Sequence, residues 1–264
     1  MIYSFSTLTM YESCPYSFYL RKIERTEGER NGYAEIGTYA HGILEKLLKK
    51  EMTFREALDD CVENFHDYIT DPYMKESTVD AKYLSFCDYL SDLNEKVLDG
   101  YQIVSTEQKL WWDLDGHKMC GVADLLLRNE QTGKLVLVDH KSSPHYLKKN
   151  GEPLKSQLEN FTKYKKQMYL YAYAIHQKYG EYPETLAWNH FLDGGSITAI
   201  PFKEEDLKET LAWAKGIIEK IENDHEYLPD TSNYLQCYVY CDYRNGICEY
   251  KGLDPDEEDY AELS

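Results

Sequence analysis

The chain has 264 residues, enough for one large domain or two small ones with a substantial core. Its formal net charge of −18 opposes encounter with polyanions, and no apolar run approaches the roughly 18 residues that a membrane helix needs. The first residues lack the basic and apolar regions of a secretory signal. The composition therefore predicts a soluble, intracellular protein.

Apolar residues recur at helical spacing through the first hundred residues. The pattern predicts a helix over residues 6–22, with Ser6 as its N-cap and an irregularity at Pro15. A second helix is predicted over 35–50, in which His41 and Glu45 are four residues apart and share one face. Further helices are predicted over 54–68 and 78–98.

The pattern then alternates as strands do, beginning with two hairpins around Asp115-Gly116 and residues 131–133. Strands are predicted over 102–113, 118–128, 134–141, 185–191 and 196–201, with helices over 156–179 and 204–223. This order predicts an α/β fold with a central mixed sheet between helices. It also predicts a single domain over residues 1–253, with a helical insertion at about 51–100 and an acidic tail over 254–264.

An apolar strand over residues 135–138 ends in Asp139, His140 and Lys141. Residues two apart on a strand project from one face, so Asp139 and Lys141 are expected to point together. A carboxylate can hold a divalent cation, and a neighbouring ammonium can stabilise charge that develops on a phosphate. A solvated ion pair is the competing interpretation of the same residues.

Asp124 lies late in the preceding apolar strand, where a carboxylate is costly to bury unless it is paired, protonated or bound to metal. Beside Asp139 it would complete a pair of convergent acids. An ion pair with Arg128 is the alternative. His41 is a possible third ligand, and Glu45 a possible ligand of a second metal.

The helix over 156–179 offers candidate DNA contacts. Gln167 and Tyr171 are four apart, so the amide and the ring share one face and are predicted to line a nucleic-acid path. Lys163 and Lys166 belong to a segment, residues 148–166, in which six lysines face two glutamates. This segment is either a strip that follows phosphates or a solvated helix face.

Seven cysteines in an intracellular chain favour metal or cluster ligation over disulfides. Three are isolated in apolar segments and are expected in the core. The other four are Cys14, Cys237, Cys241 and Cys248, at the two ends of the chain.

In this order, His41, Asp124, Asp139-His140-Lys141 and Gln167 to Tyr171 resemble the motifs of the RecB-like branch of the PD-(D/E)XK nuclease superfamily. The residues from Ser4 to Phe18 and the four terminal cysteines resemble its iron-sulfur members, the CRISPR-associated exonucleases and the AddB nuclease domain. Three and six residues separate the last three cysteines, where the family usually shows two and five.

The resemblance implies a restriction-endonuclease-like core, with N-terminal helical additions and a cysteine-bearing C-terminal segment. It implies a deoxyribonuclease in which one or two Mg²⁺ or Mn²⁺ ions are held by His41, Asp124, Asp139 and the backbone carbonyl of His140, with Lys141 catalytic. It also implies a [4Fe–4S] cluster on the four cysteines, which would close a very long loop; Zn²⁺ is the alternative.

The resemblance further implies an exonuclease acting on single-stranded DNA or DNA ends, in the cytoplasm of a bacterium or archaeon or encoded by a phage. Recombination, repair, phage replication and CRISPR adaptation all fit. No Walker-type phosphate loop is present, so a helicase or recombination partner would be another chain. Two alternatives remain: a non-catalytic nucleic-acid-binding or assembly subunit with the same fold, and a zinc-stabilised interaction module.

Overall fold

The computed structural model describes residues 1–29, 31–93, 98–232, 236–244 and 246–250. Its contacts divide the chain into two compact units. Unit 1 comprises residues 1–2 and 32–211, and unit 2 comprises residues 3–31 and 212–264. The single domain over 1–253 stays a prediction, and the acidic tail over 254–264 lies outside the described residues. Among the helices described, none combines the length and apolarity that crossing a membrane requires.

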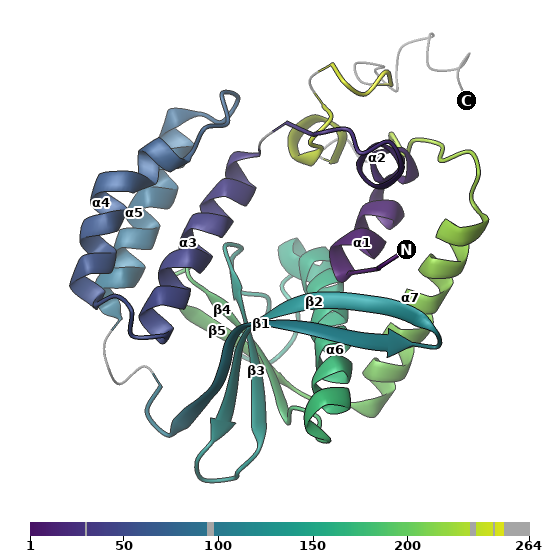
Figure 1. The fold of residues 1–264 in the computed structure, drawn as a ribbon. Helices are drawn as coiled ribbons and strands as arrows, with labels where there is room; N and C mark the ends of the chain where they lie inside the picture. Colours follow the sequence, from purple (N-terminus) through teal and green to yellow (C-terminus); the bar gives the residue numbers. More distant parts are fainter. Residues whose placement is uncertain (30, 94–97, 233–235, 245, 251–264) are drawn as a thin grey trace. The chain divides into compact units, whose positions relative to one another are not determined.

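Unit 1 is built on a five-stranded mixed sheet (Figure 1). The strands follow one another across it in chain order: β1 (Tyr101–Leu114), β2 (His117–Asn129), β3 (Leu135–Lys141), β4 (Thr185–His190) and β5 (Ser196–Pro201). Only β3 and β4 are parallel. Helix α6 (Leu158–Tyr179) supplies the crossover that a parallel pair needs. The predicted α/β class with a mixed sheet is confirmed.

Three helices form a separate cluster within unit 1: α3 (Gly32–Leu48), α4 (Phe54–Tyr68) and α5 (Glu76–Asp92). Helix α4 begins at a capping box, in which Thr53 and Glu56 bond each other's backbone N–H. The three helices share an aromatic core around Tyr39, Phe65 and Phe86. This core includes Phe191, directly after β4, and thereby ties the helices to the sheet.

Helices pack against both faces of the sheet, and a cavity of about 1000 Å³ lies on the face of Leu125 and Val138. Leu125 and Val138 pair across β2 and β3 and pack with Leu48 at the end of α3. Their neighbours Leu126 and Leu137 are fully buried and, by strand alternation, point to the other face. Helix α6 contacts β1 and β3. Polar residues at the end of β3 are thus held in a strand that is buried except at Val136 and Lys141, which are half-buried.

Unit 2 joins the two ends of the chain. It contains α1 (Phe5–Ser13), α2 (Pro15–Phe18), the π-helical turn η1 (Tyr19–Ile23), the later part of α7 (Glu204–Asn223) and the π-helical turn η3 (Gln236–Tyr240). The hydroxyl of Tyr11 donates to Asp224 at 2.8 Å, and Arg21 pairs with Asp242 at 2.6 Å. Residues more than 200 positions apart are therefore held together by specific polar contacts.

Two details of the helices differ from the predictions. The N-cap of the first helix lies two residues earlier, because the extended residue Ser4, and not Ser6, accepts the N–H of Thr7 at 3.1 Å. Pro15 then starts α2, so the predicted helix is three short segments. The helix predicted over 78–98 spans Glu76–Asp92, and residues 94–97 lie outside the described residues. An extended Leu93 ends this helix.

Candidate active site

The register of β2 and β3 brings two acids side by side. Leu125 pairs with Val138, so the preceding Asp124 lies beside the following Asp139 on the neighbouring strand. Both are buried, with 7% and 2% of their surface exposed. Burial raises the pKa of each carboxyl group. The sheet therefore holds two buried carboxyl groups side by side, and a nearby cation would stabilise their charged forms.

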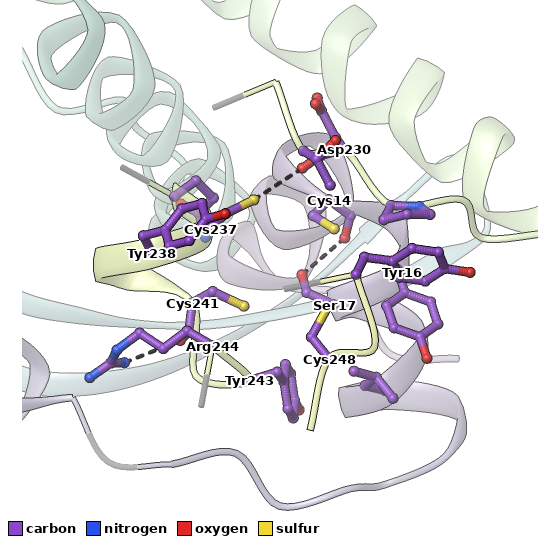
Figure 2. Close-up of a pocket in the computed structure, with 15 residues that line it drawn as sticks. Cys14, Tyr16, Ser17, Asp230, Cys237, Tyr238, Cys241, Tyr243, Arg244 and Cys248 are labelled. Atoms are coloured by element: carbon purple, nitrogen blue, oxygen red, sulfur yellow. Dashed lines mark hydrogen bonds between the residues drawn. The ribbon is translucent and has the colours of Figure 1, made fainter. Parts of the chain in front are cut away.

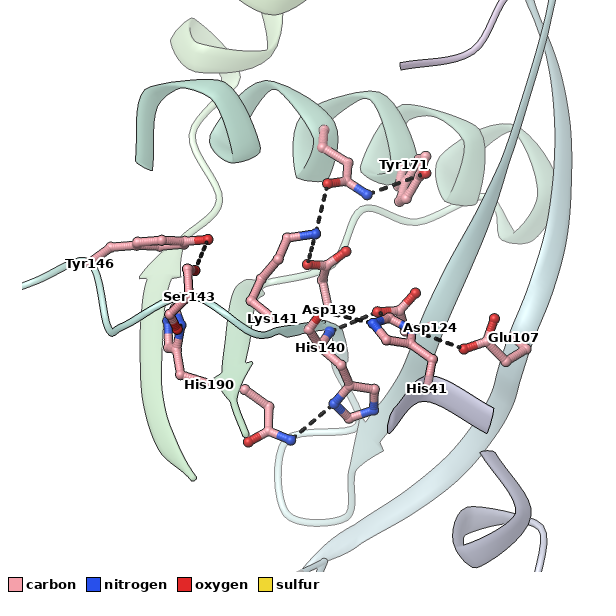
Figure 3. A network of polar contacts seen from close by, with 12 residues as sticks. His41, Glu107, Asp124, Asp139, His140, Lys141, Ser143, Tyr146, Tyr171 and His190 are labelled. Atoms are coloured by element: carbon pink, nitrogen blue, oxygen red, sulfur yellow. Dashed lines mark hydrogen bonds and ion pairs between the residues drawn. The ribbon is translucent and has the colours of Figure 1, made fainter. Parts of the chain in front are cut away.

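His41 reaches this pair from helix α3 (Figure 3). Its Nε2 lies 3.0 Å from the carbonyl oxygen of His140, which can only accept, so Nε2 carries a proton. Its Nδ1 faces Asp124 at 3.6 Å. Burial lowers the pKa of His41, but the neighbouring acids outweigh this and raise it overall. The backbone N–H of His140 in turn bonds Asp124 at 2.7 Å.

Glu107 on β1 completes the group and was not predicted. Its Oε1 lies 3.6 Å from His41 Nδ1, and one ligand atom from each of His41, Glu107 and Asp124 lies within 4.8 Å of the others. Glu107 has a φ of 44°, a left-handed conformation that is strained in a strand. A shift in the pairing of β1 with β2 lies just before it, between Ile103 and Ser105. The only sequence signal was an acid inside a predicted strand.

Asp139 and Lys141 form the predicted pair on one face of β3. The Lys141 Nζ lies 2.7 Å from Asp139 Oδ2, and 15% of the lysine side chain is exposed. Burial disfavours the ammonium, but Asp139 and its other neighbours raise the pKa of Lys141 overall. The side chain is therefore a fixed positive charge beside the acids, and not the solvated ion pair that was the alternative.

Gln167 and Tyr171 on α6 continue the network. Lys141 donates to Gln167 Oε1 at 3.2 Å, and the Gln167 amide donates to the Tyr171 hydroxyl at 3.4 Å. Tyr171 is only 7% exposed, and its ring lies where a side chain on Gly121 would meet it at 2.5 Å. In this structure Tyr171 supports Gln167 from within the fold and offers little surface to DNA.

The remaining predicted residues are less closely connected to the acids. Glu45 makes an ion pair with Lys49 on the next turn of α3. Lys163 lies over the Tyr164 ring, 5.7 Å from its centroid. Lys166 is half-buried on α6. Arg128, the alternative partner of Asp124, pairs with Glu181 at 2.8 Å, which excludes that ion pair.

The donor set of this site fits a hard divalent cation. Carboxylate oxygens suit Mg²⁺ or Mn²⁺, and an imidazole nitrogen suits Mn²⁺. Asp124, Glu107 and His41 supply such atoms within one ion's reach. Asp139 lies next to them, and the His140 carbonyl, also a predicted ligand, accepts a hydrogen bond from His41 Nε2 at 3.0 Å. His41, Glu107, Asp124 and Asp139 thus offer ligand atoms. Glu107, on β1, was not among the predicted ligands.

A second candidate site lies wholly within unit 2. The cysteines Cys14, Cys237, Cys241 and Cys248 line one cavity of about 30 Å³, and Figure 2 shows them gathered around it. Burial, followed by the neighbouring thiols, raises the pKa of both Cys237 and Cys241 to about 11. Thiolates are the soft ligands of iron–sulfur clusters and of zinc, and either group would require these cysteines to lose their protons. No three of these four described sulfur atoms lie within 4.8 Å of one another, which is wider than a single zinc ion needs.

Comparison with known proteins identifies the family. The sequence profile of the PD-(D/E)XK nuclease superfamily matches residues 2–249. The chain belongs to this superfamily. In solved structures, a "Putative exonuclease" from Eubacterium rectale is 17% identical, with a TM-score of 0.53, and the match covers 87% of this chain and 84% of that one.

A second solved structure, SSO0001, is also 17% identical, and the match covers 89% of this chain and 96% of that one. Its TM-score is 0.34, too low to support an argument. No curated protein matches the chain. The superfamily and the fold are therefore established.

Proposed function

We propose that this PD-(D/E)XK protein is a RecB-like deoxyribonuclease that requires Mg²⁺ or Mn²⁺. The observation that carries the proposal is the convergence of Asp124, Asp139 and Lys141 at one point of the sheet, with His41 and Glu107 beside them. A non-catalytic binding subunit would have no chemical use for two buried acids that lie next to each other.

His41, Glu107, Asp124 and Asp139 would hold the metal ion. A bound divalent ion would polarise the scissile phosphate and lower the pKa of an attacking water. The residues of the chain supply the rest: Lys141 presents a fixed ammonium for charge that develops on the phosphate, and Gln167 holds that ammonium in place. The backbone N–H of His140 orients Asp124.

The proposed substrate is single-stranded DNA or DNA ends, cleaved as an exonuclease. Lys163 and Lys166 on α6 would contact the phosphate backbone, and Gln167 would lie beside the path, supported from within the fold by Tyr171. Such contacts would give local attraction although the chain is acidic overall. The RecB-like motifs and the fold support this, and the same motifs occur in enzymes of recombination, repair, phage replication and CRISPR adaptation.

We further propose a [4Fe–4S] cluster on the four cysteines of unit 2, with a structural role. It would fix residues near both ends of the chain, which the ion pair of Arg21 with Asp242 already holds together. Zinc would do the same. The two are distinguished by colour: protein purified without oxygen is brown if thiolates bind iron and colourless if they bind zinc.

The decisive experiment incubates anaerobically purified protein with end-labelled single-stranded, duplex and circular DNA, each with Mg²⁺, Mn²⁺ or EDTA. We expect cleavage of the linear DNA with either metal and none with EDTA. Asp124→Asn keeps the shape of the side chain but removes its charge, and should abolish cleavage. The matched control is Asp59→Asn, an exposed acid on α4 whose loss should leave the rate unchanged.

Two results would contradict the proposal. One is full activity of Asp124→Asn. The other is the absence of cleavage of every DNA with both metals, which would favour the non-catalytic binding subunit. Cleavage of circular DNA would keep the nuclease but replace the exonuclease with an endonuclease.

A further inference from the structure

The ammonium of Lys141 has a third neighbour besides Asp139 and Gln167. Its Nζ lies 4.2 Å from the centroid of the Tyr164 ring on α6. This is well inside the distance at which a cation is attracted to the electron-rich face of an aromatic ring. Asp139, Gln167 and the ring therefore surround an ammonium that has three N–H donors.

The ring is itself held in position. It lies nearly parallel to Tyr146, with 15° between the planes and 6.3 Å between the centroids. Tyr146 is fully buried, accepts a hydrogen bond from Ser143 at 3.0 Å, and donates its backbone N–H to Thr198 at 3.1 Å. Tyr164 thus lies beside a ring that is buried and hydrogen-bonded within the fold.

The chemistry of Tyr164 suits a site that must accept a phosphate. A third carboxylate beside Lys141 would fix the ammonium, but its negative charge would repel the phosphodiester. An aromatic face attracts the ammonium through its quadrupole without a net charge. Gln167 is uncharged as well. Of the three groups that hold Lys141, only Asp139 therefore carries a negative charge that repels the phosphodiester.

We propose that Tyr164 is a positioning residue for Lys141, holding the ammonium over its ring while the lysine acts on the phosphate. This rests on the proposed nuclease function. Tyr164 acts through Lys141, so its loss should reduce kcat. Lys163, a proposed DNA contact, lies 5.7 Å from the centroid of the same ring, so any rise in KM for DNA reports on Lys163 and not on Lys141. Its hydroxyl has no part in this role.

The kinetic test compares Tyr164→Phe with Tyr164→Leu. The first keeps the aromatic face, and the second removes it while keeping an apolar side chain. We expect Tyr164→Leu to lower kcat about 10-fold, equal to about 1.4 kcal/mol of transition-state stabilisation, and Tyr164→Phe to stay near the parent. The control is Tyr173→Leu, a half-buried tyrosine elsewhere on the same helix. It should have kcat near that of the parent.

A second measurement does not depend on nuclease activity. In protein with ¹³C-labelled lysine, the ring current of Tyr164 should move the ε-CH₂ protons of Lys141 upfield, with the signal assigned by its loss in Lys141→Met. Tyr164→Phe should keep the shift and Tyr164→Leu should lose it. Failure of the nuclease proposal would leave this result intact, so the two proposals fail separately.

Three outcomes would overturn the inference: undiminished kcat in Tyr164→Leu, a loss in Tyr164→Phe as large as in Tyr164→Leu, or an ε-CH₂ shift unaffected by removal of the ring. If Tyr164→Leu does not fold, as judged by circular dichroism, Tyr164→Met is measured in its place. Its unbranched side chain fills the same space with fewer packing constraints.

Discussion

The acids on the sheet of unit 1 and the cysteines of unit 2 are two candidate metal sites held by different means. Asp124 and Asp139 sit on paired strands, and backbone hydrogen bonds set their spacing. The cysteines come from short helical turns and loops, with 222 positions between Cys14 and the next of them, Cys237, along the chain. Strand pairing positions the acids of the first site whether or not a metal ion is bound. The second would depend on its metal for much of its order.

The largest expected effect is at the sheet site. Lys141→Met should lower cleavage at least about 100-fold, because a fixed cation that stabilises developing charge is typically worth that much. End-labelled DNA and single-turnover rates measure it. Thermal unfolding should show that the variant still folds.

The control is Arg55→Met, a cation on α4 whose side chain is 88% exposed and which pairs with Asp59 four residues on. Exposed pairs of this kind contribute little, so its rate and stability should match the parent. A Lys141→Met variant with the parent's rate would show that the ion pair with Asp139 is merely structural.

At the cysteine site, Cys14→Ser should remove bound metal and loosen the ends of the chain. A hydroxyl is a poor substitute for a thiolate ligand, and the binding energy of a structural metal is also folding energy. Iron and zinc per chain, together with limited proteolysis, measure the two effects.

Cys120→Ser is the matched control, since Cys120 is a half-buried residue of β2 in unit 1. It should keep the full metal content. Equal metal content in the parent and in Cys14→Ser would show that Cys14 does not bind the metal, and would contradict the four-cysteine site.

Glu107→Gln should have a smaller effect on the sheet site. The amide keeps the shape but weakens an oxygen ligand, so the Mg²⁺ concentration for half-maximal activity should rise about 10-fold. The KM for DNA should not change. Glu63→Gln, an exposed acid on α4, is the control. An unchanged metal requirement would exclude Glu107 from the metal site. The strained backbone at Glu107 would then have no role in metal binding.

Gly121→Ala should have the smallest effect, exerted through packing. The added methyl group would come within 2.5 Å of the Tyr171 ring and displace the residue that supports Gln167. We expect a loss of about 1–3 kcal/mol in the free energy of unfolding, measured in urea, and a few-fold fall in cleavage.

The control is Gly37→Ala on helix α3, where an added methyl group meets nothing within 4 Å. It should be neutral or stabilising by up to about 1 kcal/mol. If Gly121→Ala has the parent's stability, the close approach of the Tyr171 ring is not a constraint on this site.

The elements with strong periodicity were predictable because their signals are local. The five strands and helix α4 appear within a few residues of their predicted bounds. Asp139 and Lys141 were expected on one face because strand alternation is a local rule, and the structure pairs them. The cap at Ser4 was misplaced because Ser4 and Ser6 both suit an N-cap, and only the extended backbone at Ser4 decides between them.

Glu107 and Tyr164 could not be predicted, because their roles depend on register and on packing between elements. Glu107 reaches His41 from a strand with a register shift and a left-handed residue, features that no periodic pattern reports. Tyr164 is one of 25 tyrosines, and nothing in the sequence separates it from those that serve only the core. Its distance from Lys141 Nζ is a property of how α6 crosses β3.

The sequence by itself determined the α/β class, the motif order and the residue types that the chemistry needs, because periodicity and motif spacing are written along the chain. Only the tertiary structure decided that Asp124 faces His41 and not Arg128, that Tyr171 is buried, and that four distant cysteines share a cavity. These outcomes depend on contacts between residues far apart in sequence, whose energies are fixed only once strand register and helix packing are set.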